Sequence, residues 1–136
     1  VINTLVPYTF STHVKDMAVE EYENGFLLSE VPLGNGYLDL PSMVNLCRQH
    51  NPDVTFSLEM ITRDPLQIPC LTGSYWNTFE NIPAKELAHT LQMLQKNQYK
   101  SSLPRVSQLT TEERLAIEED NIISSLVYSR NKLGLI

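Results

Sequence analysis

Two segments of the chain nearly repeat each other. They read TFSTHVKD at residues 9–16 and TFSLEMITRD at residues 55–64, and polar side chains alternate with apolar ones in both. A period of two, with many β-branched and aromatic residues, predicts β-strands near residues 8–15 and 54–61. This repeat constrains the fold more than any other feature, because it predicts two similar strands about one βα unit apart.

The segment between these strands predicts a long loop followed by a helix. Asn24-Gly25 and the Gly34–Gly36 stretch are turn signals. Asp39 can cap a helix near residues 40–50, in which apolar residues recur at helical spacing. Strand, helix and strand form a βαβ unit, which places the two strands side by side and parallel.

The rest of the chain predicts a second long loop at residues 62–82 and two further helices. One helix is expected near residues 83–97. The other, near residues 110–133, begins with a capping box formed by Thr110 and Glu113. One stripe of this last helix carries large apolar residues, namely Leu115, Ile122, Leu126 and Leu133.

The predicted fold class is α/β. Parallel sheets are normally covered on both faces, which two strands cannot achieve alone. We therefore expect a partial (β/α)8 TIM barrel that covers the last two βα units, plus a C-terminal helical extension. In this interpretation residues 1–136 are a single C-terminal fragment, about a quarter of the ring.

His13 and Glu59 occupy the same place in the two repeats, four residues after the leading threonine. Small hydroxyls followed by His or Glu are costly to bury without partners, and are expected where a barrel strand ends in an active site. An imidazole and a carboxylate at similar height suit a divalent cation. Two simpler alternatives remain open: a hydrogen-bonded core histidine, and a carboxylate paired with Lys15 or Arg63.

Three stretches carry a resemblance to a known family: THVKDM at residues 12–17, EVPLGNGYLDL at residues 30–40 and FSLEMITRDP at residues 56–65. Together they resemble the last two strands of xylose-isomerase-like barrels, in particular the sugar phosphate isomerase/epimerase group. The resemblance covers residues 9–65. It implies that His13 and Glu59 are metal ligands, and that Gly34, Gly36 and Asp39 match an element between the two strands.

The same resemblance implies a chemistry. Such enzymes bind Mn²⁺, Mg²⁺, Co²⁺ or Zn²⁺ and move a proton next to a sugar carbonyl through an enediolate. Glu59 would be a ligand and an acid/base group, and Lys15 could contact substrate oxygens or pair with a carboxylate. The strands that supply the family's other ligands lie outside this sequence, so the chain by itself is not expected to catalyse.

Four further residues are candidates for substrate binding. Arg63 could bind an anionic group of a sugar phosphate. Gly34 and Gly36 could bind phosphate through their amides, or form a plain turn. Trp76 could shape a sugar pocket, or pack its loop onto the barrel rim.

Composition limits the partners. The net charge is −6 and the pI is about 4.9, which argues against a nucleic-acid partner. Apolar runs are too short to span a bilayer. Cys47 and Cys70 form no metal-binding pair, so a reducing cytoplasm is the expected location.

Three functions therefore compete. The first is a metal-dependent sugar or sugar-phosphate isomerase/epimerase. The second, less favoured because of the acidic charge and the single histidine in the strand, is an abasic-site DNA endonuclease of the same fold. The third is a non-catalytic module that acts by association, because open sheet edges favour a homo-oligomer or pairing with the missing part of a barrel.

Overall fold

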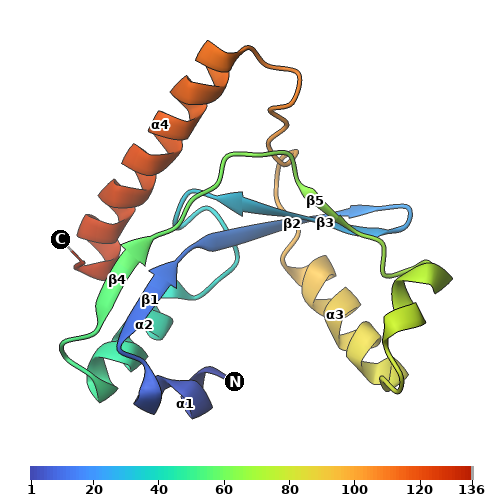
Figure 1. Ribbon diagram of the computed structural model, residues 1–136, viewed down its shortest axis with the longest axis horizontal. Coiled ribbons are helices and arrows are strands. Elements are labelled where there is room, and N and C mark those ends of the chain that lie inside the picture. The colour runs from blue at the N-terminus through green and yellow to red at the C-terminus, as the bar shows by residue number, and fades with distance from the viewer. Residues whose placement is uncertain (136) are drawn as a thin grey trace.

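The computed structural model describes residues 1–135 (Figure 1). In chain order its elements are α1 (Ile2–Leu5), η1 (Val6–Tyr8), β1 (Ser11–Val14), β2 (Asp16–Tyr22), β3 (Gly25–Val31), α2 (Leu40–His50), β4 (Thr55–Leu58), β5 (Leu66–Ile68), η2 (Gly73–Thr78), α3 (Ala84–Lys96), α4 (Thr111–Tyr128) and η3 (Ser129–Leu133). None of these helices is long and apolar enough to cross a membrane.

The predicted parallel pair is confirmed. β1 and β4 pair in parallel, with Ser11 opposite Thr55 and Val14 opposite Leu58. The connecting helix is α2, and the Asp39 side chain caps it by accepting a hydrogen bond from the Ser42 amide at 3.2 Å. Both strands are shorter than expected, because regular pairing covers only residues 11–14 and 55–58.

The long loop predicted before α2 is wrong for much of its length. Residues 16–31 form an antiparallel hairpin of β2 and β3, closed by the two-residue turn Glu23-Asn24. β5 then pairs antiparallel with β3 and makes a second sheet of order β2-β3-β5. The loop predicted at residues 62–82 thus contains a short strand and the η2 turn.

Gly25 shows why β5 lies so close to the hairpin. Its φ of +149° is a conformation that residues with a side chain rarely adopt. A Cβ atom there would overlap the Ile68 carbonyl oxygen and lie 2.9 Å from the Cys70 amide nitrogen. Glycine at this position therefore allows the backbone of β5 to approach β3.

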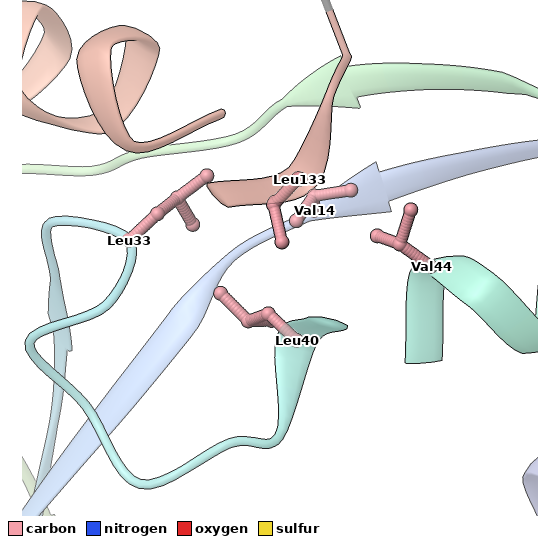
Figure 2. Packing of buried hydrophobic residues seen from close by; sticks show 5 residues of the cluster. All are labelled: Val14, Leu33, Leu40, Val44 and Leu133. Carbon is pink, nitrogen blue, oxygen red and sulfur yellow. The ribbon is translucent and has the colours of Figure 1, made fainter. Parts of the chain in front are cut away.

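The main core lies on one face of the β1–β4 pair (Figure 2). Val14 from β1 meets Leu40 and Val44 from α2 and Leu133 from the C-terminal turn, and Leu33 joins them from the loop after β3. A second cluster of Ala18, Leu27, Val31 and Leu103 lies in the hairpin region. Each sheet therefore has its own apolar cluster.

The predicted helices are confirmed as α3 and α4. The Thr110 hydroxyl accepts from the Glu113 amide, and the Glu113 carboxylate accepts from the Thr110 amide, which completes the expected capping box. The last predicted turn is a π-helix, η3. The apolar stripe is divided, however, because Leu133 is buried whereas Leu115, Ile122 and Leu126 are exposed.

Residues 1–135 form a mixed α/β structure of helices and two small sheets, without a closed barrel. Only the β1–α2–β4 segment has the order that a barrel requires. The three-stranded antiparallel sheet is an addition that a simple (β/α)8 pattern does not contain.

Candidate functional site

The polar face of the β1–β4 pair brings three predicted residues together. His13 lies in β1, Lys15 directly after it, and Glu59 directly after β4. The Glu59 amide donates to the Val14 carbonyl at 3.0 Å, so the strand pairing extends up to this carboxylate. The alternation of side chains that places Val14 in the core sends the other set to the opposite face, as the sequence predicted.

His13 and Glu59 are in direct contact. Nδ1 of His13 lies 2.8 Å from Oε2 of Glu59. An ionised carboxylate can only accept, so Nδ1 donates and carries the proton. Nε2 of the neutral imidazole is then left with a lone pair, and the side chain is 68% exposed. This arrangement of carboxylate and histidine resembles the way carboxylates orient metal-bound or proton-transferring imidazoles.

Lys15 takes the other oxygen of Glu59. Its ammonium group donates to Oε1 of Glu59 and lies 3.4 Å from Oε1 of Glu30. The hydrogen bond from Lys15, and then that from His13, lowers the pKa of Glu59 below its ordinary value of 4.5. The bond to Glu59 in turn raises the pKa of Lys15 above 10.5. Glu59 is therefore held ionised, as both a metal ligand and a proton acceptor require.

Glu30 is a member of the cluster that the sequence analysis missed. It is only 5% exposed, yet it interacts with Lys15, lies 3.7 Å from the Arg63 guanidinium, and accepts from the Ile61 amide at 2.9 Å. A glutamate next to Val31 and two residues after Leu28 was a signal, because a carboxylate buried with such neighbours needs cationic or amide partners. Through Glu30, Arg63 joins the edge of the cluster.

Gly34 and Gly36 have a structural partner. Their amides donate to Oδ2 of buried Asp16 at 2.9 and 3.0 Å, and the Leu38 amide donates to its Oδ1 at 3.2 Å. A Cβ atom on Gly36 would overlap that carboxylate. The loop is thus wrapped around an internal anion, and a phosphate at these two amides would have to displace Asp16. The structure supports the plain-turn alternative for both glycines.

Trp76 packs within its own turn. Its indole nitrogen donates to the Cys70 carbonyl at 2.9 Å, and its ring lies 5.0 Å from Tyr75 and 5.4 Å from Phe79, measured between centroids. These contacts account for Trp76 as a residue that orders η2. They support its packing alternative, and the sugar-pocket role stays a prediction.

The donor set fits a divalent metal only in part. His13 offers Nε2. Glu59 could offer an oxygen to the same ion only if its hydrogen bonds from Lys15 and from Nδ1 of His13 were broken, because Nδ1 and Nε2 lie on opposite sides of the ring. Within residues 1–135, no three His, Cys, Asp or Glu side chains come together as a metal site. The described residues thus offer two ligands, the two that the sequence analysis named.

Comparison of the chain with protein-family models, with curated proteins and with solved structures finds no match. The resemblance to xylose-isomerase-like barrels therefore rests on the residues quoted above alone.

Proposed function

We propose that this chain contributes part of the active site of a metal-dependent sugar or sugar-phosphate isomerase/epimerase, built on the last two βα units of a (β/α)8 barrel. One observation carries the proposal. His13, Lys15 and Glu59 converge on the exposed face at the carboxyl ends of two adjacent parallel strands. Active sites of such barrels lie at that end of the strands.

Each residue has a role in this proposal. His13 is a metal ligand through Nε2. Once its hydrogen bonds from Lys15 and from Nδ1 of His13 are released, Glu59 is a second ligand and the group that exchanges a proton with the substrate carbon. Lys15 keeps Glu59 ionised and faces the substrate oxygens, while Arg63 receives an anionic group of the substrate. A bound Mn²⁺, Mg²⁺, Co²⁺ or Zn²⁺ ion would polarise the substrate carbonyl.

The site needs a cover. The His13 side chain is 68% exposed and that of Glu59 is 33% exposed, so water has free access to both. Proton transfer next to a carbonyl is favoured in a site from which water is excluded, because electrostatic interactions there are stronger and reactive intermediates are protected. In our proposal, other barrel strands complete the metal shell and close this face.

The free thiols of Cys47 and Cys70 support a cytoplasmic location.

Metal binding at His13 tests the proposal. We expect Mn²⁺ to broaden the NMR signals of the His13 imidazole at lower concentrations than those of His50 and His89, which lie outside the cluster. Glu59→Gln should remove this preference, because it removes the second ligand. Glu21→Gln, at an exposed glutamate of β2, is the matched control and should leave the preference unchanged. Equal broadening of the three histidines would contradict the proposal.

A substrate titration extends the same experiment. With Mg²⁺ present, we expect a ketose phosphate to shift the signals of His13 and Arg63, while inorganic sulfate at the same concentration does not. Shifts that sulfate reproduces would indicate a general anion site instead of a sugar site.

A second candidate is a non-catalytic module that acts through association. The observation that favours it is the number of large apolar side chains left exposed along α4, which include Leu115 at 60%, Val127 at 53% and Ile123 at 51%. Exposed apolar patches commonly mark interaction sites. Metal titration separates the candidates, because the association module has no need of an ion at His13.

A further inference from the structure

Helix α4 is turned the opposite way from an ordinary surface helix. Its core-facing side carries Ser125, which is fully buried, accepts a hydrogen bond from the Leu33 amide and donates to the Asn121 carbonyl. Its outer side carries Ile123 and Val127, which are 51% and 53% exposed. Ile122 and Leu126 lie beside them at 36% and 41%, and Leu126 also lines a small cavity next to Val14 and Leu33. Surface helices normally bury the apolar side. Figure 1 shows α4 at the edge of the molecule.

These four residues form one continuous stripe. Leu126 and Val127 follow Ile122 and Ile123 by one helical turn, so side chains four apart lie next to each other. Ile123, Leu126 and Val127 also line a shallow groove of about 240 Å³, together with Arg130 and Asn131. We call Ile122, Ile123, Leu126 and Val127 the outer stripe of α4.

The charges at the two ends of the outer stripe are complementary. Glu119 lies one turn before Ile122 and Ile123, and Arg130 lies just beyond Val127; both are exposed. Within residues 1–135, neither takes part in a salt bridge. The stripe therefore begins with a carboxylate and ends with a guanidinium, each without a partner among the described residues.

The order of these residues is self-complementary. In two antiparallel copies of α4 related by a twofold axis midway between Ser124 and Ser125, Ile123 lies level with the partner's Leu126 and Ile122 with the partner's Val127. The same register places Glu119 level with the partner's Arg130, at both ends of the contact. A twofold interface requires this reciprocity, in which residue i meets residue j and j meets i.

We propose that the outer stripe of α4 is the contact face of a homodimer, in which α4 packs antiparallel against α4 of a second copy. The apolar pairs supply the buried area, and the two Glu119–Arg130 pairs set the register and the antiparallel direction. The contact lies on α4, which contributes no residue to the cluster of His13, Lys15 and Glu59, and it does not depend on the proposed catalytic function.

Sedimentation equilibrium of the chain over micromolar to millimolar concentrations tests this proposal. We expect a monomer–dimer equilibrium for the wild type. Ile123→Glu should raise the dissociation constant at least about 100-fold, because it buries two unpaired carboxylates. Leu71→Glu is the matched control, since Leu71 is 54% exposed and lies outside the stripe, and it should leave the constant unchanged.

Charge reversal tests the register. Glu119→Arg alone places like charges at both ends of the contact, and so does Arg130→Glu alone. Each should raise the dissociation constant about tenfold, which corresponds to ~1.4 kcal/mol. An equimolar mixture of the two variants should form a heterodimer of near wild-type strength, because each of its end pairs again joins opposite charges. A salt bridge within one chain cannot give this rescue.

Three results would overturn the proposal. A wild-type chain that stays monomeric would show that some other protein surface covers the stripe. A dimer that Ile123→Glu leaves intact would place the interface elsewhere. Failure of the mixed variants to regain affinity would exclude the antiparallel register. Circular dichroism of each variant checks that α4 still folds, which we expect because the changed side chains are exposed in the monomer.

Discussion

The parallel unit and the antiparallel sheet of this molecule are built differently. β1 and β4 pair over only four residues each, and their partners are far apart in sequence, as with Ser11 and Thr55. β2 and β3 pair over seven residues and are joined by a two-residue turn. The parallel unit depends on α2 and the C-terminal turn for its core, whereas the hairpin is formed by neighbouring residues. Pairing between strands that are far apart in sequence depends more on tertiary contacts than a hairpin does, because a short turn already holds the two strands of a hairpin together.

The candidate site lies in one of these two regions, and residues that support it lie in the other. The candidate site lies on the parallel pair, and its open face is polar. The antiparallel sheet supplies Glu30, which is buried and contacts Lys15, and Asp16, which holds the loop before α2. The hairpin therefore holds Lys15 in place through Glu30, and holds the loop before α2 in place through Asp16. Three predictions would break or sharpen this division.

The largest effect is expected at the junction of the two regions. Asp16→Asn keeps the shape of the side chain but replaces an ionised acceptor of several amides by a neutral amide. We expect a loss of about 3 kcal/mol in the free energy of unfolding, measured by urea denaturation, because hydrogen bonds to buried charged groups are strong. Asp53→Asn, at an exposed aspartate, should change it by less than about 0.5 kcal/mol. Equal effects would show that Asp16 does not join the regions.

A smaller effect is expected within the antiparallel sheet alone. Gly25→Ala combines an unfavourable φ with an overlap against the Ile68 carbonyl, so we expect a loss of about 2 kcal/mol. Trp76, the only tryptophan, hydrogen-bonds to Cys70 two residues after β5, and its fluorescence should report the change. The His13–Glu59 contact should survive, as checked by the NMR signals of His13.

Gly73→Ala is the matched control for this substitution. A Cβ atom at Gly73 meets no other atom within 4 Å, so the variant should behave like the wild type. If Gly25→Ala also separated His13 from Glu59, the two regions would be one cooperative unit and the comparison would fail.

The smallest effect concerns the charges on the parallel pair. The folded-state pKa of Glu59 lies below 4.5, so its contribution to stability is complete above that pH and is lost as the pH falls through the lowered value. The raised pKa of Lys15 acts in the opposite sense: its contribution is present below 10.5 and is lost as the pH rises through the raised value. We expect carbon-detected NMR titration to show Glu59 titrating below 4.5.

Two variants separate the causes of this shift. Lys15→Met should move the pKa of Glu59 upward more than His13→Gln does, because the hydrogen bond from Lys15 is the larger cause. Lys85→Met, at an exposed lysine of α3, is the control and should not move it. A Glu59 that titrates at its ordinary value in the wild type would refute the cluster as described.

Sequence patterns predicted the parallel unit better than the hairpin. The TFS repeats identified both strands and their outward faces, and Asp39 marked the start of α2. The hairpin was missed because Asn24-Gly25 was interpreted as a turn inside a loop. The flanking segments DMAVEEY and GFLLSEV each group three apolar residues together, so they lack the period of two that identifies a strand. The turn itself is Glu23-Asn24, with Gly25 already in β3. β5 offered little signal, since only Leu66, Gln67 and Ile68 pair.

By itself, then, the sequence determined the positions of β1, α2, β4, α3 and α4, because capping residues and hydrophobic periodicity act over a few neighbouring residues. It also indicated that His13 and Glu59 share a face. Only the tertiary structure decided that Lys15 and His13 both bind Glu59, that Asp16 occupies the glycine loop, and that the apolar side of α4 faces outward. The physical reason is that hydrogen-bond partners and burial depend on which distant segments meet, and local patterns do not encode that choice.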